Sequence, residues 1–391
     1  MADARKVALV RGAIPVTRNH IYFNAGSVGP LADLTVEVLN HENTLELEAG
    51  RASLESRESK LEAKTSLRRA LARLVKGTEG EIALTNHTTA GMNIVAHGLD
   101  WRPGDEVVTT NLEHPGGLIP LYVLRQRHGV VVKVVEIEAV HGPAEIVARL
   151  EAAITPRTRL LAYSHVAWNL GLRLPLEEIV ALGRRHGALS LVDGAQSVGA
   201  IPLDLPATGV DFYAMPGQKW LCGPEGVGGL YIRKDRLSLV QPTFVGYASL
   251  TDGSHDWTGY FMPAPGAQRY EVATVYNPGI KAMVANLNWL EEKVGWSWIY
   301  ERTAQLADHL RAQLSNLPGV RLITPRGNHA GLTSFTLTGH DPAQVLRRLA
   351  AEGIILRTIK EPSCLRVSTG FYNTEAEIER LVAVLQTILK T

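Results

Sequence analysis

Apolar, β-rich runs alternate with helical patterns through the middle of this chain. Five runs have the composition of buried strands: residues 106–110, 130–137, 159–165, 189–193 and 228–232. Between them, residues 144–154 and 176–187 carry apolar side chains at helical spacing, and glycine or proline often marks the change of pattern. Such alternation indicates βαβ units. We therefore predict an α/β fold with a mostly parallel sheet covered by helices on both faces.

The chain is long enough for two domains. It has 391 residues, and domains of more than about 250–300 residues usually split. After a long helical pattern at 281–317, strand-like and helical segments alternate up to a final helix after Asn373. This pattern predicts a compact α+β unit. We predict a large domain at 31–280 and a smaller one formed by residues 1–30 and 281–391.

Composition excludes several classes of protein. The net charge is +1, so no overall field recruits nucleic acid or an anionic membrane. No apolar run reaches the length of about 18 residues typical of a transmembrane helix. The first 15 residues are too charged for a secretory leader. The two cysteines, Cys222 and Cys364, suit a reducing compartment and lie in no metal-binding cluster. We expect a cytoplasmic protein without a metal, a membrane or a nucleic-acid partner.

An acid and a lysine stand out in the segment from residue 189 to residue 229. Asp193 ends an apolar strand, and Lys219 follows 26 positions later between Gly217 and Gly223. A lysine amine in a dry pocket has a depressed pKa and can form an imine. A buried carboxylate needs a charged partner, which a protonated pyridinium provides. Pyridoxal phosphate (PLP) requires this pair of groups, and Gln196 could hydrogen-bond its ring hydroxyl.

Further polar residues follow predicted strands. His165 and Asp193 lie at strand carboxyl ends, and His114 lies just past another. Ligands of such sheets bind beyond these ends, where the His114 ring could stack on a cofactor or shuttle a proton. Thr88 and Thr89 open a helical pattern, so their hydroxyls and the backbone N–H groups there could bind an anion. A simple N-cap is the alternative for this pair.

Two arginines flank a short loop near the C-terminus. They are Arg357 and Arg366, in the run LRTIKEPSCLRVS. Arginine binds a carboxylate through a bidentate fork. One arginine could hold the α-carboxylate of an amino acid, and two could hold a substrate with two carboxylates. Surface ion pairing is the alternative for either residue alone.

The motifs DGAQS, GQKWLCGPEGVGGLY, EHPG and YNTEAEI together resemble the fold-type I PLP enzymes. The resemblance covers nearly the whole chain and is to the class V aminotransferase and cysteine desulfurase group. Within that group, SHVAWNLG, YEVAT and LRTIKEPSCLR are most similar to the cystine/cysteine C–S lyases. The resemblance implies a seven-stranded, mostly parallel sheet between helices and a smaller α+β domain. It also implies a homodimer with shared active sites that lie between the domains.

The resemblance also implies roles for single residues. Lys219 matches the Schiff-base lysine, Asp193 the partner of the pyridinium nitrogen, and His114 the stacking histidine. Implied cofactor contacts are Thr88, Thr89, His114, Asn169, Asp193, Gln196, Gln218, Lys219 and Thr274. Implied substrate contacts are Ala25, Gly26, Asn169, Arg357 and Arg366.

Among these, Thr274 matches a threonine that reaches the phosphate bound by the partner subunit. Arg366 matches the arginine for the α-carboxylate, and Arg357 matches the arginine for the distal carboxylate.

The chain departs from the family pattern just before the lysine. Where relatives have serine or threonine and then, after a glycine, histidine, this chain has Pro216 and Gln218. Proline offers the phosphate neither a hydroxyl nor an N–H, whereas the Gln218 amide can still donate. Cys364 and Cys222 are both unsuitably placed for the persulfide-forming cysteine of desulfurases, so we expect packed thiols.

The resemblance implies a PLP-dependent lyase that cleaves C–S bonds by β-elimination. Its substrates would be L-cystine or L-cysteine-type amino acids, and its products pyruvate, ammonia and a persulfide or sulfide. Lys219 would remove the α-proton as general base. Alternatives with the same cofactor residues are a class V aminotransferase, a cysteine desulfurase, an enzyme like isopenicillin N epimerase, and a PLP-binding protein without turnover.

Overall fold

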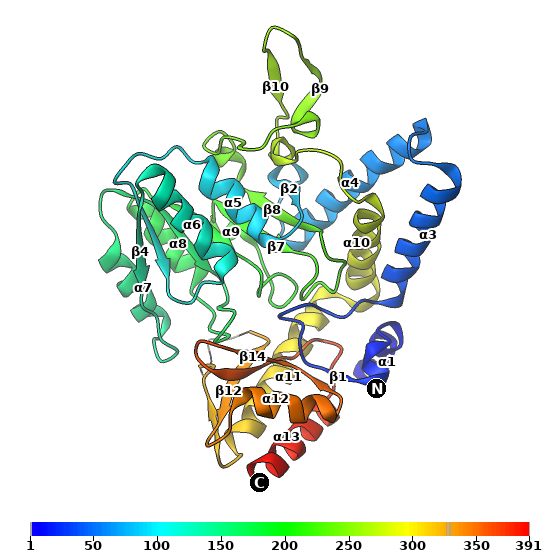
Figure 1. The fold of residues 1–391 in the computed structure, drawn as a ribbon, viewed down its shortest axis with the longest axis vertical. Coiled ribbons are helices and arrows are strands. Elements are labelled where there is room, and N and C mark those ends of the chain that lie inside the picture. Colours follow the sequence, from blue (N-terminus) through cyan, green and yellow to red (C-terminus); the bar gives the residue numbers. More distant parts are fainter. Residues whose placement is uncertain (1, 326, 328–329, 391) are drawn as a thin grey trace.

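Seven strands form the central sheet of the computed structural model, which describes residues 2–325, 327 and 330–390 (Figure 1). In spatial order they are β2 (Ile82–Thr85), β8 (Gly228–Ile232), β7 (Phe212–Pro216), β6 (Leu189–Asp193), β5 (Thr158–Ser164), β3 (Glu106–Thr110) and β4 (Val131–Val135). The five predicted strands are β3, β4, β5, β6 and β8. The strands β2 and β7 were not predicted from the sequence.

The sheet is mostly parallel, as predicted. Strands β7, β6, β5, β3 and β4 pair in parallel, whereas β8 runs antiparallel to both β7 and β2. The direction of β8 follows from its connection to β7. Only residues 217–227 join the two strands, which is too short for the crossover that a parallel pair needs. This connection carries Lys219.

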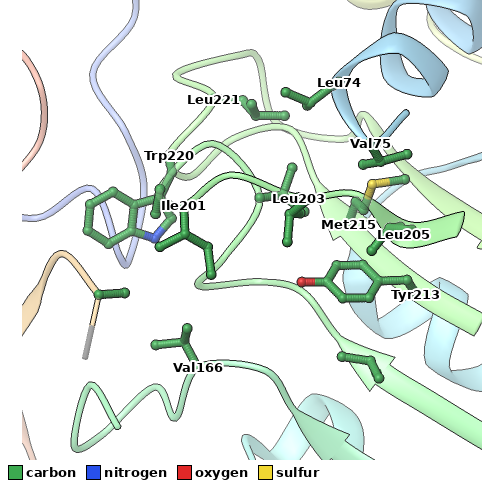
Figure 2. Close-up of a cluster of buried hydrophobic side chains, with 14 of the residues drawn as sticks. Leu74, Val75, Val166, Ile201, Leu203, Leu205, Tyr213, Met215, Trp220 and Leu221 are labelled. Atoms are coloured by element: carbon green, nitrogen blue, oxygen red, sulfur yellow. The ribbon is translucent and has the colours of Figure 1, made fainter. Parts of the chain in front are cut away.

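Helices cover both faces of the sheet. Alternate side chains of β7 point to opposite faces, so Phe212 and Ala214 pack with α5 (Thr88–Gly98) and α6 (Pro115–His128). Tyr213 and Met215 join the opposite core, which includes side chains of α4 (Leu54–Leu74), α7 (Pro143–Ala153) and α8 (Leu176–Arg185). Figure 2 shows part of this second core, in which Tyr213 and Met215 lie near Val75, Leu203 and Leu205.

The C-terminal part forms a smaller α+β unit with a core of its own (Figure 1). Its antiparallel sheet has the order β11 (Val320–Leu322), β12 (Leu332–Leu337), β15 (Cys364–Ser368), β14 (Arg357–Ile359). Its helices are α11 (Trp296–Ser315), α12 (Pro342–Ala351) and α13 (Glu375–Leu389). This arrangement agrees with the α+β pattern predicted for the end of the chain.

The N-terminus is attached to this smaller unit. Strand β1 (Ile21–Tyr22) pairs in parallel with β13 (Ile354–Ile355). On α1 (Ala2–Ala13), the Arg11 guanidinium forms an ion pair with Glu377 at 2.7 Å. The division into residues 31–280 and residues 1–30 with 281–391 stays a prediction. Residue 280 lies within α10 (Asn277–Trp289), which packs against α3 (Asp33–Ala49) and α4 of the large unit.

Remaining elements are the short helices α2 (Val16–Asn19) and α9 (Leu205–Thr208) and the hairpin of β9 (Leu250–His255) and β10 (Phe261–Pro263). The hairpin projects from the body of the molecule (Figure 1). Among the described helices, none is both long and apolar enough to cross a bilayer.

Candidate active site

A cavity of about 550 Å³ lies at the carboxyl-terminal edge of the central sheet. It is lined by Gly26, Ser27, His87, Thr88, Thr89, His114, Trp168, Asp193, Ala195, Gln196, Gln218, Lys219, Arg357 and Arg366. Ten of the residues predicted from the sequence are therefore brought together here, from segments spread over more than three hundred positions. This edge is where open α/β sheets bind ligands.

Lys219 lies in the tight connection between β7 and β8. The turn is closed by backbone hydrogen bonds from Gly217 to Val227 and from Cys222 to the Lys219 carbonyl. The side chain is half-buried. Burial lowers the pKa of the Lys219 amine to about 8, with Arg366 and Arg357 acting in the same direction and Asp193 opposing them. At pH 7 about a tenth of the amine is therefore the uncharged nucleophile and base, far more than for an ordinary lysine.

Asp193 is the last residue of β6 and is 5% exposed. Its Oδ1 accepts a hydrogen bond from the Ala195 backbone N–H at 2.8 Å. Burial raises the pKa of this carboxyl, whereas the Lys219 charge and the Ala195 hydrogen bond lower it. A buried carboxylate with one backbone donor needs a cationic partner in the cavity, and a pyridinium N–H has the required charge.

His114 is the N-cap residue of α6. Its Nδ1 accepts a hydrogen bond from the Gly116 backbone N–H at 3.0 Å, so the ring proton of the neutral imidazole is on Nε2. Burial lowers the pKa of His114 to about 4, and the charges of Lys219, Arg357 and Arg366 add to this effect. The ring is therefore neutral at physiological pH. It can cover a planar cofactor without adding positive charge to it.

Gln196 is held at both ends of its amide. Its Nε2 donates to the Gly26 carbonyl at 2.8 Å, and its Oε1 accepts from the Trp220 indole N–H at 2.9 Å. These bonds connect the loop after β6, the Lys219 turn and the N-terminal segment that closes the cavity. A Cβ built on Gly26 would lie 3.0 Å from this Oε1, so the segment approaches closely because it carries glycine.

Two unpartnered polar atoms lie beside the N-terminus of α5. Thr88 Oγ1 and Gln218 Oε1 are buried and have no hydrogen-bond partner among the described residues. Rotation of the Gln218 amide by half a turn presents its N–H groups instead. A helix N-terminus with free side-chain donors is suited to a phosphate. The residues therefore fit PLP, with Lys219 and Asp193 for the ring and Thr88 and Gln218 for the phosphate.

Arg357 and Arg366 are directly opposite each other on β14 and β15. Both donate to the Ser27 hydroxyl, Arg357 at 3.2 Å and Arg366 at 3.0 Å. Neither lies within 4 Å of a carboxylate in the described part of the chain. Like charges at opposite positions of two strands are destabilising. Both guanidiniums line the cavity, where a bound carboxylate could pair with them.

Three predicted site residues do not line this cavity. Ala25 is buried beside it. Asn169 lies just outside, where its Nδ2 donates to the Glu361 carbonyl at 3.2 Å and its Oδ1 accepts from the Leu170 N–H. Thr274 lines a separate cavity of about 1080 Å³ and is hydrogen-bonded to the Tyr247 hydroxyl at 2.6 Å. A second chain would be needed to bring Thr274 to a site of this kind, as the predicted dimer requires.

Four lining residues were missed by the sequence analysis: Ser27, His87, Trp168 and Ala195. His87 caps α5 by accepting the Ala90 backbone N–H on Nδ1, and the Ala195 backbone N–H donates to Asp193. Each of the four directly adjoins a predicted site residue, and this adjacency was the signal available in the sequence.

Both thiols are buried and have raised pKa values. Cys222 and Cys364 are completely buried, and neither lines the cavity. Burial raises the pKa of Cys222 to about 12 and that of Cys364 to about 11. The expectation of packed thiols is therefore consistent with the structure, since the thiolate is the reactive form.

Known proteins share this architecture. The model of the family described as aminotransferase class-V matches residues 30–381. A probable cysteine desulfurase from Methanothermobacter thermautotrophicus is 31% identical over 406 aligned positions, covering 97% of each protein. Another from Mycolicibacterium paratuberculosis is 32% identical over 78% of this chain, but this match spans only 46% of that relative.

A solved structure supports the same assignment. The cystine C–S lyase C-DES, in complex with its reaction product cysteine persulfide, matches with a TM-score of 0.90 and 35% identity, covering 95% of this chain and 99% of that one. The fold and the family predicted from the motifs are thereby confirmed. The chain belongs to the class-V aminotransferase family and is a PLP-dependent enzyme.

Proposed function

We propose that this enzyme is a C–S lyase that cleaves L-cystine or related amino acids by β-elimination. The observation that carries the proposal is the pair of guanidiniums, Arg357 and Arg366, at one end of the cavity without a carboxylate partner among the described residues. Arg366 would bind the α-carboxylate. Arg357 would bind the distal carboxylate. A disulfide amino acid has both groups, whereas a small monocarboxylic substrate leaves one guanidinium unpaired.

The chain's own groups can carry the proton transfers. PLP, when bound, supplies an electron sink for the negative charge that develops on the substrate Cα. The Lys219 Nζ takes the α-proton, which its lowered pKa permits near neutral pH. Asp193 would hold the positive charge of the ring nitrogen, and His114 would cover the ring as a neutral imidazole. Arg366 orients the substrate through its carboxylate.

The overall reaction balances with water as the only co-reactant. The Cα–H and Cβ–S bonds of L-cystine break, and the electron pair of the C–S bond leaves with the persulfide sulfur. Water then replaces the amino nitrogen. The products are pyruvate, ammonia and cysteine persulfide. With L-cysteine as substrate, the sulfur product is sulfide instead.

The placement of the cysteines favours this reaction over persulfide transfer to the protein. A desulfurase of the ordinary type needs a thiolate that attacks the substrate sulfur. Cys222 and Cys364 are buried away from the cavity, and their pKa values are raised to about 12 and 11. Sulfur therefore leaves on the substrate fragment. Two buried reduced thiols also suit a cytoplasmic location, which we propose.

We further propose that the active enzyme is a homodimer. Thr274 lies in the second cavity with Arg127, Tyr276 and other residues of the large unit. In the dimer its hydroxyl would complete the phosphate site of the partner subunit. Each subunit would then supply one cofactor contact to the other.

Replacement of Arg357 tests the substrate assignment. We expect Arg357→Ala to lower kcat/KM for L-cystine by about 10- to 100-fold, the loss of a hydrogen-bonded charge pair. For S-methyl-L-cysteine, which has one carboxylate, we expect a loss of less than about threefold. Arg321→Ala, on β11 of the same sheet and exposed, is the control and should change neither value. Equal losses for both substrates would refute the distal-carboxylate role.

A further inference from the structure

Trp168 lines the cavity between His114 and Arg357. It belongs to the loop that follows β5, between the bridged residues Val166 and Arg173. Its ring meets the His114 ring edge-to-face, with centroids 5.2 Å apart at 87°. On the other side, the Arg357 guanidinium carbon is 5.8 Å from the centroid of the same ring. One side chain therefore contacts both the histidine predicted to stack on the cofactor and one of the two cavity arginines.

The backbone around this ring is fixed on both sides. The Trp168 carbonyl accepts a hydrogen bond from Arg366 Nη1 at 2.7 Å. The next carbonyl, that of Asn169, accepts from the Ser334 hydroxyl at 2.6 Å, and the Asn169 amide donates to the Glu361 carbonyl. The loop thus spans from the central sheet to the smaller unit. Its attachment determines where the indole faces the cavity and where Arg366 points.

We propose that Trp168 is a specificity-determining residue, which selects dicarboxylic substrates with an apolar, sulfur-containing middle. The inference rests on the proposed function and extends it to the part of the substrate between the carboxylates. The indole face holds the Arg357 guanidinium in the direction of the distal carboxylate by a cation–π contact. Sulfur packs favourably against such a ring, and a polar chain loses its water there.

Binding of non-reactive ligands tests this role apart from catalysis. L,L-2,7-diaminosuberate has the two head groups of cystine and no sulfur to eliminate, whereas L-2-aminooctanoate has the same chain length and lacks the distal head group. Their dissociation constants are measured by calorimetry on the PLP-loaded enzyme. We expect Trp168→Leu to reduce the preference for the dicarboxylate by about tenfold, and Trp168→Phe, which keeps an aromatic face, by less than threefold.

Trp298 provides a matched control. It is also partly buried and faces a cation, since Lys6 Nζ lies 5.6 Å from its ring centroid, but it is outside the cavity. Trp298→Leu should leave the preference unchanged. With L-cystine, Trp168→Leu should raise KM about tenfold and change kcat less, because the ring orients the distal carboxylate and not the reacting atoms.

The outcomes separate this inference from the proposed function. If Trp168→Leu weakens both ligands equally, or Trp298→Leu changes the preference as much, the specificity role is refuted even when the wild type releases pyruvate from L-cystine. If the wild type releases none but Trp168→Leu still removes a preference for diaminosuberate, the specificity role stands and the lyase proposal fails.

Discussion

At the scale of single residues, the site depends on an acid that the sequence analysis did not single out. Glu113 directly precedes His114 and is buried. Its Oε1 accepts from the Thr110 hydroxyl at 2.6 Å and its Oε2 from the Ser164 hydroxyl at 2.7 Å. The carboxyl thus fastens the loop carrying His114 to the ends of β3 and β5. Burial raises the pKa of Glu113 to about 7, and the charge of Asp193 adds to this effect.

This acid predicts a pH-dependent stability. A carboxyl whose pKa is raised on folding contributes most to the stability of the folded protein at pH values below the pKa that it has in the unfolded chain. This contribution is lost as the pH rises through the pKa that it has in the folded protein, about 7. Relative to Glu113→Gln, the wild type should lose about 3 kcal/mol of unfolding free energy between pH 4.5 and pH 7. Denaturant unfolding of both proteins across this range measures the difference. A constant difference would show that the pKa of Glu113 is the same in the folded and the unfolded protein, which would contradict the raised pKa.

Contacts between residues that are far apart in the sequence could not be predicted from local patterns. Asp193 and Lys219 were identified because strand, turn and glycine patterns mark their surroundings locally. Ser27 is joined to Arg366 across 339 positions, and nothing near residue 27 indicates that contact. Trp168 was likewise missed, because its partners His114 and Arg357 come together only in the folded chain.

At the scale of elements, the turn between β7 and β8 packs directly on the N-terminal segment. The Gly29 N–H donates to the Gln218 carbonyl at 2.7 Å. A Cβ built on Gly29 would lie 2.0 Å from the Lys219 carbonyl oxygen, so any side chain there forces the two segments apart. The position of the lysine therefore depends on a glycine about 190 positions earlier in the chain.

We predict that Gly29→Ala displaces the Lys219 turn. Cofactor affinity and kcat should each fall by about tenfold or more, because misplacement of a reacting group by about 1 Å can cost two orders of magnitude. Gly12→Ala is the control, since a Cβ there meets nothing within 4 Å and helix α1 gains a better helix former. The absorbance of bound cofactor, followed in a PLP titration, checks both variants. Unchanged affinity and rate in Gly29→Ala would contradict the close approach.

Strands were predicted correctly where glycine marks a boundary beside a run of strand-forming residues. The runs at 106–110, 130–137 and 189–193 are rich in valine, leucine or threonine, and a glycine lies within two residues of each. The missed strand β2 has four residues, and β7 ends in proline, which argues against a central strand. The antiparallel direction of β8 has no signature in its own residues. It results from the length of the turn before it.

At the scale of the whole molecule, the second cavity and the projecting hairpin are consistent with association. Thr274 lines a cavity separate from the one that holds Lys219. Large apolar side chains are exposed around the hairpin, among them Trp257, Tyr260 and Phe261, and Phe244 is also exposed. Exposed apolar clusters of this kind often mark contact surfaces. The proposed dimer would cover them.

Subunit mixing tests the dimer. We expect Thr274→Val to weaken PLP affinity about tenfold by removing one hydrogen bond to a charged phosphate. At limiting PLP, mixing Thr274→Val subunits with inactive Lys219→Ala subunits should restore activity. Each hybrid dimer has one site in which both Lys219 and the partner's Thr274 are intact. A Lys219→Ala, Thr274→Val double variant is the control and should restore none. If mixing Thr274→Val subunits with Lys219→Ala subunits gives no increase in activity, active sites shared between subunits are excluded.

The central claim is tested most directly by the products formed from L-cystine. The purified, PLP-loaded enzyme is incubated with L-cystine in the absence of a keto-acid acceptor, and pyruvate, ammonia, alanine and persulfide are quantified. The account predicts pyruvate and ammonia in equal amounts together with cysteine persulfide. Alanine with a persulfide would contradict it in favour of a desulfurase, and no product from an enzyme with bound PLP would exclude L-cystine as the substrate.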